Sequence, residues 1–176
     1  MKIGSIELAS PFVVSPMAGM TDTAFRRLVK RQGGCGLVVS EMVSSEGLVR
    51  GIGRTLEYAE YTEEERPVSI QIFGGEPAKM AEAARVVEQM GANIVDVNMG
   101  CPVPKIAKHH AGCSLMREPS HAASIVRAMT DAMTDPTGPG SGGPDTPSPP
   151  TDPRPDGDPP PSSPGHYQHI PVTVED

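Results

Sequence analysis

The feature that most constrains the fold of this chain is a repeated alternation of short apolar runs with amphipathic stretches. The apolar runs begin near residues 12, 37, 68 and 94, so successive runs are spaced by 25, 31 and 26 residues. Each is followed by a segment whose apolar residues recur with helical periodicity. Strands that alternate with helices at this interval form parallel pairs joined by right-handed crossovers. The chain is therefore predicted to be an α/β protein, either a barrel or a doubly wound sheet.

Capping residues mark the ends of the predicted helices. Thr21 or Asp22 can cap a first helix that stops at Gly33. Pro77 opens another helix, which stops at Gly91, and the last helix starts near Ser120. A less regular helical stretch is expected to follow the second strand as far as Glu65.

The first helix is predicted to be amphipathic. Its buried face is expected to consist of Ala24, Phe25, Leu28 and Val29. Its exposed face is expected to consist of Arg26, Arg27, Lys30 and Arg31. The acidic run of residues 63–65 is also interpreted as a solvated face.

Polar and conformationally special residues stand where the predicted strands end, and this favours a barrel over a doubly wound sheet. They are Pro16-Met17-Ala18, Glu41, Gln71, and Asn98 with Cys101. Barrel active sites are built at the carboxyl ends of several strands at once. A complete (β/α)8 barrel typically needs about 250 residues, whereas this chain has 176. We therefore expect a partial TIM-type barrel of about four βα units, with residues 170–174 as a possible fifth strand.

The composition changes abruptly after residue 134. Residues 135–165 contain 12 of the 20 prolines and no aliphatic or aromatic side chain. Such a run cannot bury enough apolar surface to offset chain entropy. We expect three parts: a half barrel at 1–134, a disordered Pro/Gly/Asp-rich segment at 135–169, and a remnant of strand five at 170–176. Residues 135–176 also carry seven acidic residues and one basic residue of a chain with net charge −7, so the part before them is nearly neutral and is not a free-standing nucleic-acid binder by charge alone.

Three side chains are the main candidates for chemistry. Cys101 lies in a Gly-Cys-Pro turn after a strand, where a thiol could act as nucleophile or proton donor, or could be a small buried hydrophobe. Asn98, at the same strand end, could orient a ligand carbonyl or amide edge, or could tie down the following loop. Gln71 is a polar side chain in an apolar strand, so it is expected to meet either a polar ligand edge or a neighbouring loop.

The remaining sequence features are less specific for a function. The turn of residues 16–20 offers two methionines that could lie against a flat ring or fill the core. The basic cluster Lys105, Lys108, His109 and His110 could meet phosphate or be an ordinary solvated loop. The three cysteines have no CxxC spacing, so neither a disulfide framework nor a metal site is expected. No apolar run approaches membrane-spanning length, and a cytoplasmic protein is expected.

Four segments, in this order and spacing, resemble the tRNA-dihydrouridine synthase family. They are residues 16–22 (PMAGMTD), 40–43 (SEMV), 71–74 (QIFG) and 96–102 (DVNMGCP). The resemblance covers about residues 5–133 and resumes weakly at 170–174. Members of this family have an FMN-binding TIM barrel followed by a helical domain that holds tRNA, and they reduce the C5–C6 double bond of uridine with NADPH as electron donor.

The resemblance implies roles for six residues. Pro16, Met17 and Ala18 would contact the flavin, and Gln71 would hydrogen-bond its ring edge. Asn98 would lie near the target base, and Cys101 would donate the proton. Free thiols are mostly protonated at neutral pH, which suits this task. The uridine must also leave the folded RNA to reach the flavin.

Several family features have no counterpart in this sequence. They are the lysine after strand five, the histidine after strand six, the glycine-rich phosphate-binding segments of the last strands and the helical domain. We therefore expect a truncated chain with weak or no affinity for FMN. Two alternatives remain at this stage: a catalytically dead fragment, or another FMN-dependent pyrimidine reductase such as the dihydroorotate or dihydropyrimidine dehydrogenases. The oligomeric state is not predicted.

Overall fold

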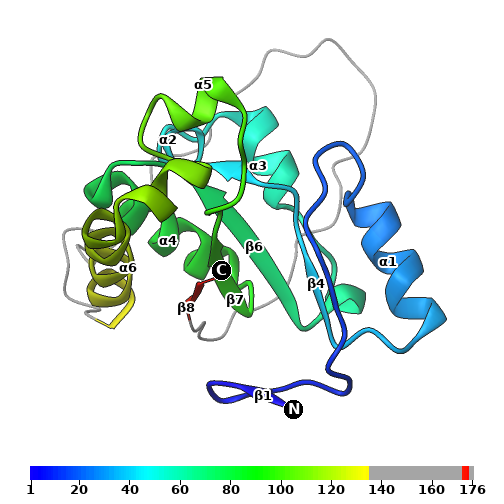
Figure 1. The fold of residues 1–176 in the computed structure, drawn as a ribbon. Helices are drawn as coiled ribbons and strands as arrows, with labels where there is room; N and C mark the ends of the chain where they lie inside the picture. The colour runs from blue at the N-terminus through cyan, green and yellow to red at the C-terminus, as the bar shows by residue number, and fades with distance from the viewer. Residues whose placement is uncertain (135–171, 175–176) are drawn as a thin grey trace, which may run out of the picture.

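A parallel β-sheet forms the centre of the protein in the computed structural model, which describes residues 1–134 and 172–174 (Figure 1). The main strands, in spatial order, are β3 (Val13–Val14), β4 (Leu37–Val39), β6 (Val68–Phe73), β7 (Ile94–Val97) and β8 (Val172–Val174). Short β5 (Val43–Ser44) also pairs with β6. All these pairs are parallel. The architecture is that of a partial TIM-type barrel, which confirms the predicted fold class.

Helices connect the strands and cover one side of the sheet (Figure 1). They are α1 (Thr23–Gln32), α2 (Ser45–Val49), α3 (Gly53–Ala59), α4 (Pro77–Met90), α5 (Pro104–Ala107) and α6 (Pro119–Thr134), with 3₁₀ turns η1 (Glu63–Glu65) and η2 (Gly112–Arg117). The four predicted βα units are thus present. Strand β8 lies within the segment predicted as a fifth strand. The predicted disordered segment 135–169 lies outside the described residues, and the three-part division of the chain stays a prediction.

Local signals set the ends of the two helices that were predicted from capping residues. The Asp22 side chain accepts a hydrogen bond from the backbone N–H of Phe25, and α1 ends at Gly33 with φ of 79°. Helix α4 has Pro77 in its first turn and ends at Gly91 in the left-handed conformation, with φ of 80°. Glycine adopts these positive φ values without the steric cost that a Cβ imposes. Both helices confirm the sequence prediction.

The two faces of the sheet bury different apolar clusters. Along β7, Val95 and Val97 belong to a large cluster that also contains Met80 and Val87 of α4 and Ile125 of α6. This cluster packs the helices on the outer face of the sheet. Full burial of such side chains contributes roughly 1.5–3 kcal/mol each, so this layer supplies most of the apolar stabilisation.

A smaller cluster occupies the inner face at the amino ends of the strands. Ile94 packs there with Leu37 and Leu8, and Ile3 and Ile6 pack against them. The last two come from an antiparallel hairpin, β1 (Lys2–Ile3) with β2 (Ile6–Glu7), which the sequence did not predict. The hairpin covers the amino end of the barrel interior. The carboxyl end is left for the polar residues described below.

The predicted faces of α1 are wrong at three positions, one of which is Ala24, expected to be buried but exposed. Arg26, expected to be exposed, is 1% exposed, whereas Leu28, expected to be buried, is 56% exposed. Arg26 Nε donates to Glu65 Oε2 at 2.6 Å, and its two terminal nitrogens donate to the backbone carbonyls of Thr21 and Glu60. Helical periodicity identifies an apolar stripe, but it cannot show that a charged residue has a buried partner 39 residues away.

The acidic run 63–65 is likewise only partly solvated. Glu65 is fully buried, and its Oε1 accepts hydrogen bonds from the Thr23 hydroxyl at 2.5 Å and the Thr62 backbone N–H at 2.9 Å. Glu64 lies at the surface, where hydrogen bonds from Arg31 and then Arg27 lower its pKa to about 2. The run therefore pairs α1 with η1 instead of forming one solvated face.

Replacing Arg26 with methionine is expected to destabilise the fold strongly, because Glu65 would keep a buried charge without its cationic partner. Removing one partner of a buried ion pair costs about 3–5 kcal/mol, which urea unfolding can measure. The matched control is Arg27→Met, whose partner Glu64 lies at the surface; it should cost no more than about 1 kcal/mol. Equal unfolding midpoints for the two variants would contradict this assignment.

Candidate functional site

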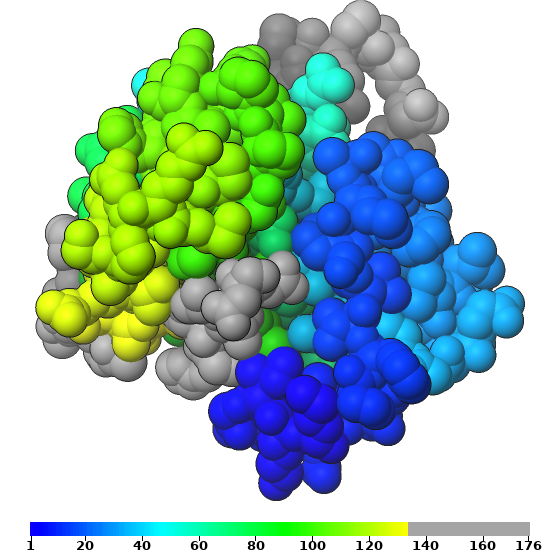
Figure 2. All heavy atoms as spheres, in the orientation of Figure 1, coloured from blue at the N-terminus to red at the C-terminus, as the bar shows by residue number. Residues whose placement is uncertain are grey.

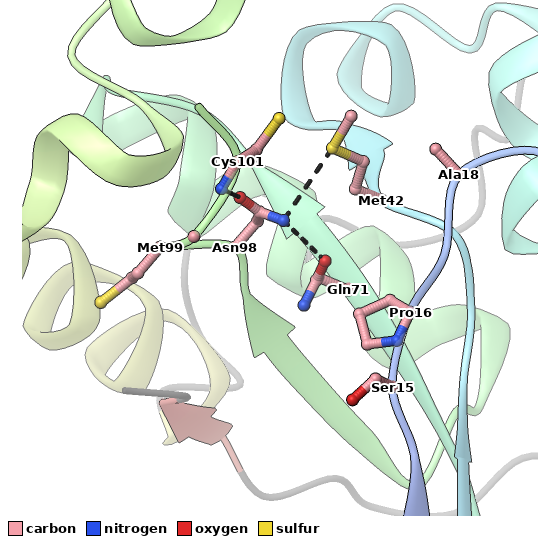
Figure 3. Close-up of a pocket in the computed structure, with 9 residues that line it drawn as sticks. Ser15, Pro16, Ala18, Met42, Gln71, Asn98, Met99 and Cys101 are labelled. Atoms are coloured by element: carbon pink, nitrogen blue, oxygen red, sulfur yellow. Dashed lines mark hydrogen bonds between the residues drawn. The ribbon is translucent and has the colours of Figure 1, made fainter. Parts of the chain in front are cut away.

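A pocket of about 370 Å³ opens at the carboxyl ends of the strands (Figure 3). It is lined by Ser15, Pro16, Ala18, Met42, Gln71, Asn98, Met99, Gly100 and Cys101. Every lining residue lies at or just after the carboxyl end of a strand, except Gln71, which lies within β6. In Figure 2 the blue surface of the N-terminal residues and the green surface near residue 100 face each other across a groove. The volume of the pocket falls in the range of small-molecule sites, about 300–1,000 Å³.

The inner face of β6 and β7 carries the polar floor of this pocket. Gln71 is paired in register with Asp96, and both side chains are 2% exposed. Gln71 Nε2 donates to Asp96 Oδ2 at 2.6 Å. A side chain of this kind in an otherwise apolar strand is costly to bury without a hydrogen bond. Gln71 thus has a partner within a neighbouring strand, which neither of the two predicted possibilities specified; contact with a ligand edge stays a prediction.

Asn98 continues the same chain of hydrogen bonds towards Cys101. Its Nδ2 donates to Gln71 Oε1 at 2.8 Å, and its Oδ1 accepts from the backbone N–H of Cys101 at 3.0 Å (Figure 3). Asn98 Nδ2 also lies 3.9 Å from the sulfur of Met42. Asn98 thus ties down the loop that follows it, as one of its two predicted roles requires, and it also lines the pocket.

The loop that carries Cys101 is held at its carbonyl as well. Cys101 O accepts a hydrogen bond from the backbone N–H of Cys113 at 3.0 Å. Gly112, the residue before Cys113, has φ of 59°, and a Cβ on it would lie only 2.6 Å from Cys101 O. A side chain at this position would therefore push the Cys101 loop away. The thiol of Cys101 is free and partly exposed. In Figure 3 its sulfur points away from Gln71, on the side of Asn98 opposite Ser15.

The first loop forms the opposite wall of the pocket. The Thr21 hydroxyl accepts from the Met17 N–H at 3.1 Å and donates to the Met17 carbonyl at 3.2 Å, which closes a tight turn. Glu41 Oε2 accepts from the backbone N–H of Gly19 at 2.7 Å, so the loop after β4 holds this turn. Gly19 has φ of 76°, a conformation that favours glycine.

The structure brings five of the six predicted site residues into one pocket: Pro16, Ala18, Gln71, Asn98 and Cys101. Met17 does not line the pocket, and its side chain is 41% exposed. Its contribution among the described contacts is the backbone of the turn. A flavin contact by Met17 stays a prediction.

Four lining residues were not assigned a role in the site from sequence. Ser15, Met42, Met99 and Gly100 each adjoin a residue or segment that was singled out, so adjacency to a strand end was the available signal. Met99 also packs in the outer apolar cluster, and its side chain points away from Gln71 in Figure 3. At Gly100 nothing lies within 4 Å of the position of a Cβ.

A second cavity, of about 850 Å³, shares Met42 with the first and is lined in part by the predicted basic cluster. Lys105, Lys108, His109 and His110 line it together with acidic residues Glu46 and Glu76. Hydrogen bonding to Glu76 raises the pKa of Lys79 in this cavity. Basic and acidic residues thus both line this cavity, and a phosphate site stays one of two interpretations.

Gly75 holds this loop region close to α4. A Cβ at Gly75 would overlap the backbone carbonyl oxygen of His109. In addition, Nε2 of His121 in α6 lies 2.8 Å from the carbonyl oxygen of Gly75. Gly75→Ala should therefore displace the 104–111 segment, lower the thermal midpoint and speed tryptic cleavage after Lys105 and Lys108. Gly53→Ala is the control, because nothing lies within 4 Å of its Cβ position. Equal cleavage rates in the two variants would contradict this packing.

Two absences can be stated for residues 1–134 and 172–174. No cluster of three or more His, Cys, Asp or Glu side chains there could hold a metal ion. No helix in that part of the chain is long and apolar enough to cross a membrane.

These features define a class: a partial TIM-type barrel with a polar pocket at the carboxyl ends of its strands. Residues 13–138 match the family model described as dihydrouridine synthase. The chain belongs to the dihydrouridine synthase family. All residues that line the pocket lie within the matched range.

Curated relatives agree with this assignment. The chain is 42% identical over 137 residues to the probable tRNA-dihydrouridine synthase of Rickettsia bellii (strain RML369-C), covering 77% of this chain and 42% of the relative. It is 44% identical over 138 residues to the probable tRNA-dihydrouridine synthase of Rhodobacter capsulatus, with 77% and 42% covered. It is 42% identical over 136 residues to tRNA-dihydrouridine synthase B of Xanthomonas axonopodis pv. citri, with 77% and 41% covered. The chain spans about two fifths of the length of these relatives.

Proposed function

We propose that this chain serves as a tRNA-dihydrouridine synthase, in which FMN-dependent reduction of the C5–C6 double bond of uridine uses NADPH as electron donor. The observation that carries the proposal is the single pocket that joins Pro16, Ala18, Gln71, Asn98 and Cys101, within the residues that match the family. The family match favours this reaction over those of other FMN-dependent pyrimidine reductases. A tRNA substrate also implies a cytoplasmic location.

The lining residues fit one end of a flavin ring system. Pro16, Ala18 and Met42 offer an apolar wall, and Gln71 and Asn98 offer amide groups whose polar atoms can recognise a heteroaromatic edge. Pro16 and Ala18 would lie against the ring, and Gln71 would meet its polar edge. Asn98 would lie near the target base.

Bound FMN would supply a hydride to C6 of the uridine. Negative charge then develops at C5, and a positioned acid must deliver a proton there. Cys101 is the acid in this proposal: its S–H bond would break, and the proton would bond to C5 through the electron pair released from the C5–C6 double bond. The thiolate left on Cys101 would then take a proton from solvent. The hydrogen bond from Cys101 N–H to Asn98 and the one from Cys113 N–H to Cys101 O hold the backbone of this acid at both sides.

Flavin binding and product formation test the proposal directly. With FMN added in excess, because weak affinity is expected, the purified chain should shift the visible absorption of the flavin and form dihydrouridine on unmodified tRNA with NADPH. A colourless chain that forms no dihydrouridine even with added FMN would reject the activity and leave the family assignment intact. A chain that reduces free orotate or free pyrimidine bases but not tRNA would favour the alternative reductases.

Cys101→Ala should lower dihydrouridine formation by at least ~10²-fold, the range that positioned acids contribute, while the flavin is still reduced by NADPH. Cys113→Ala is the matched control, because Cys113 is also a free, partly exposed thiol but does not line the pocket. Alkylation of Cys101, followed by mass spectrometry, should slow when FMN is added. Unchanged turnover in Cys101→Ala would remove the thiol from the mechanism.

A further inference from the structure

Asp96 is a buried acidic residue to which the proposed mechanism gives no task. It lies on the inner face of β7, the same face as Ile94, and it is 2% exposed. The outer-face neighbours Val95 and Val97 are apolar. Burial of a carboxyl group is costly unless hydrogen bonds compensate it. The described contact that meets this requirement is the 2.6 Å hydrogen bond from Gln71 Nε2.

A series of three hydrogen bonds links Asp96 to Gln71, Gln71 to Asn98, and Asn98 to the backbone of Cys101. Only one assignment of donors and acceptors satisfies all three. The backbone N–H of Cys101 can only donate, so the atom of Asn98 that faces it must be the oxygen. Asn98 then presents its nitrogen to Gln71, which must present its oxygen in return. The nitrogen of Gln71 is consequently the group that faces Asp96, and a carboxylate oxygen can accept from it. The Cys101 N–H at one end of this hydrogen-bond series and the Asp96 carboxylate at the other therefore require the same orientation of the two amides.

Turning either amide over would break two hydrogen bonds at once. If Gln71 were reversed, its oxygen would face the Asp96 oxygen and its nitrogen would face the Asn98 nitrogen. Each contact would then join two acceptors or two donors. The contact between Gln71 and Asp96 is buried, where an unsatisfied polar group costs about 1–3 kcal/mol. Ser40 also holds the backbone of β6 at Gln71, because its Oγ accepts from the Gln71 backbone N–H at 3.1 Å.

We propose that Asp96 is a positioning residue that sets the donor and acceptor order of the Gln71 and Asn98 amides. The pocket consequently presents a fixed pattern of polar atoms to the edge of a heteroaromatic ligand. Asp96 itself acts through Gln71 and does not touch the ligand. The identity of the ligand as flavin and uridine rests on the proposed function, whereas the orientation of the amides does not.

The side-chain amides can be observed without any ligand. The full chain is labelled with ¹⁵N in its Asn and Gln side chains, and hydrogen exchange of these groups is followed by NMR. In the unmodified chain the amide hydrogens of Gln71, which is buried and hydrogen-bonded, should exchange at least ~10-fold more slowly than those of exposed Gln32 and Gln89. The amide hydrogens of Asn98, which is half-buried and donates to Gln71, should also exchange more slowly than these references.

Asp96→Ala should remove this protection from Gln71 and reduce it at Asn98. Asp96→Asn retains an acceptor oxygen, so it should rescue part of the protection. Val95→Ala is the control for destabilisation of β7, because Val95 lies on the opposite face in the outer cluster; it should leave the Gln71 signal protected. Unchanged Gln71 and Asn98 exchange in Asp96→Ala would overturn the proposal, as would equal loss in Val95→Ala.

A swapped pair keeps the proposal testable if Asp96→Ala does not fold. Gln71→Glu alone sets two carboxyl groups against each other across β6 and β7. Adding Asp96→Asn supplies a donor to the new carboxylate, which can also accept from Asn98. The double variant should therefore unfold at a higher urea concentration than Gln71→Glu alone. No gain in the double variant would overturn the proposal.

FMN titration separates this inference from the proposed function. If the chain binds no FMN but the amides respond to Asp96→Ala as expected, the proposed function fails and the orientation stands. If FMN binds, Asp96→Ala should weaken it at least ~10-fold and shift the flavin absorption, because the amide order at the ring edge is no longer fixed. Equal affinity and an identical spectrum would reject the positioning role towards the ligand.

Discussion

The pocket depends on the register between β6 and β7. Parallel pairing sets Gln71 beside Asp96, and the side-chain amide of Asn93 fixes the start of this register by accepting from the Val68 backbone N–H at 3.0 Å and from Arg66 at 3.1 Å. Side chains alternate between the two faces of a strand, so a slip of one residue would exchange the faces. Asp96 would then enter the outer apolar cluster, and valines would line the pocket. The burial of both faces makes such a slip very costly.

Buried polar networks secure the site from two sides. Inside the barrel, the hydrogen bonds from Asp96 to the Cys101 backbone order the floor of the pocket. Outside it, the pair of Arg26 with Glu65 holds the Thr21 carbonyl and thus the end of the turn that begins at Pro16. Each network joins residues that lie far apart in the sequence. Buried polar groups of this kind are tolerated because their hydrogen bonds are made, and the loss of one partner leaves the others unsatisfied.

Much of the fold could be predicted because its signals are local. Apolar runs of strand length, the cap at Asp22 and the glycines at 33 and 91 each act within a few residues. The β1–β2 hairpin was missed because two-residue strands carry too little periodicity to be recognised. The faces of α1 were wrong because the partner of Arg26 comes from η1, and no local pattern encodes that pairing. For the pocket, the position of Pro16, Ala18, Asn98 and Cys101 after strand ends predicted that they lie close together, since the carboxyl ends of parallel strands meet at one edge. Gln71 lies within β6 instead, and the chemical roles of these residues stay predictions.

The sequence by itself determined the βα rhythm, the helix ends and the chemical types of the residues at the carboxyl edge. These depend on backbone preferences and on side-chain periodicity, which act over short distances along the chain. Only the tertiary structure decided that Met17 serves the turn through its backbone, that Glu41 holds Gly19, and that Asp96 orients Gln71. These outcomes depend on which donors and acceptors meet when strands pair, and burial then requires each of them to find a partner.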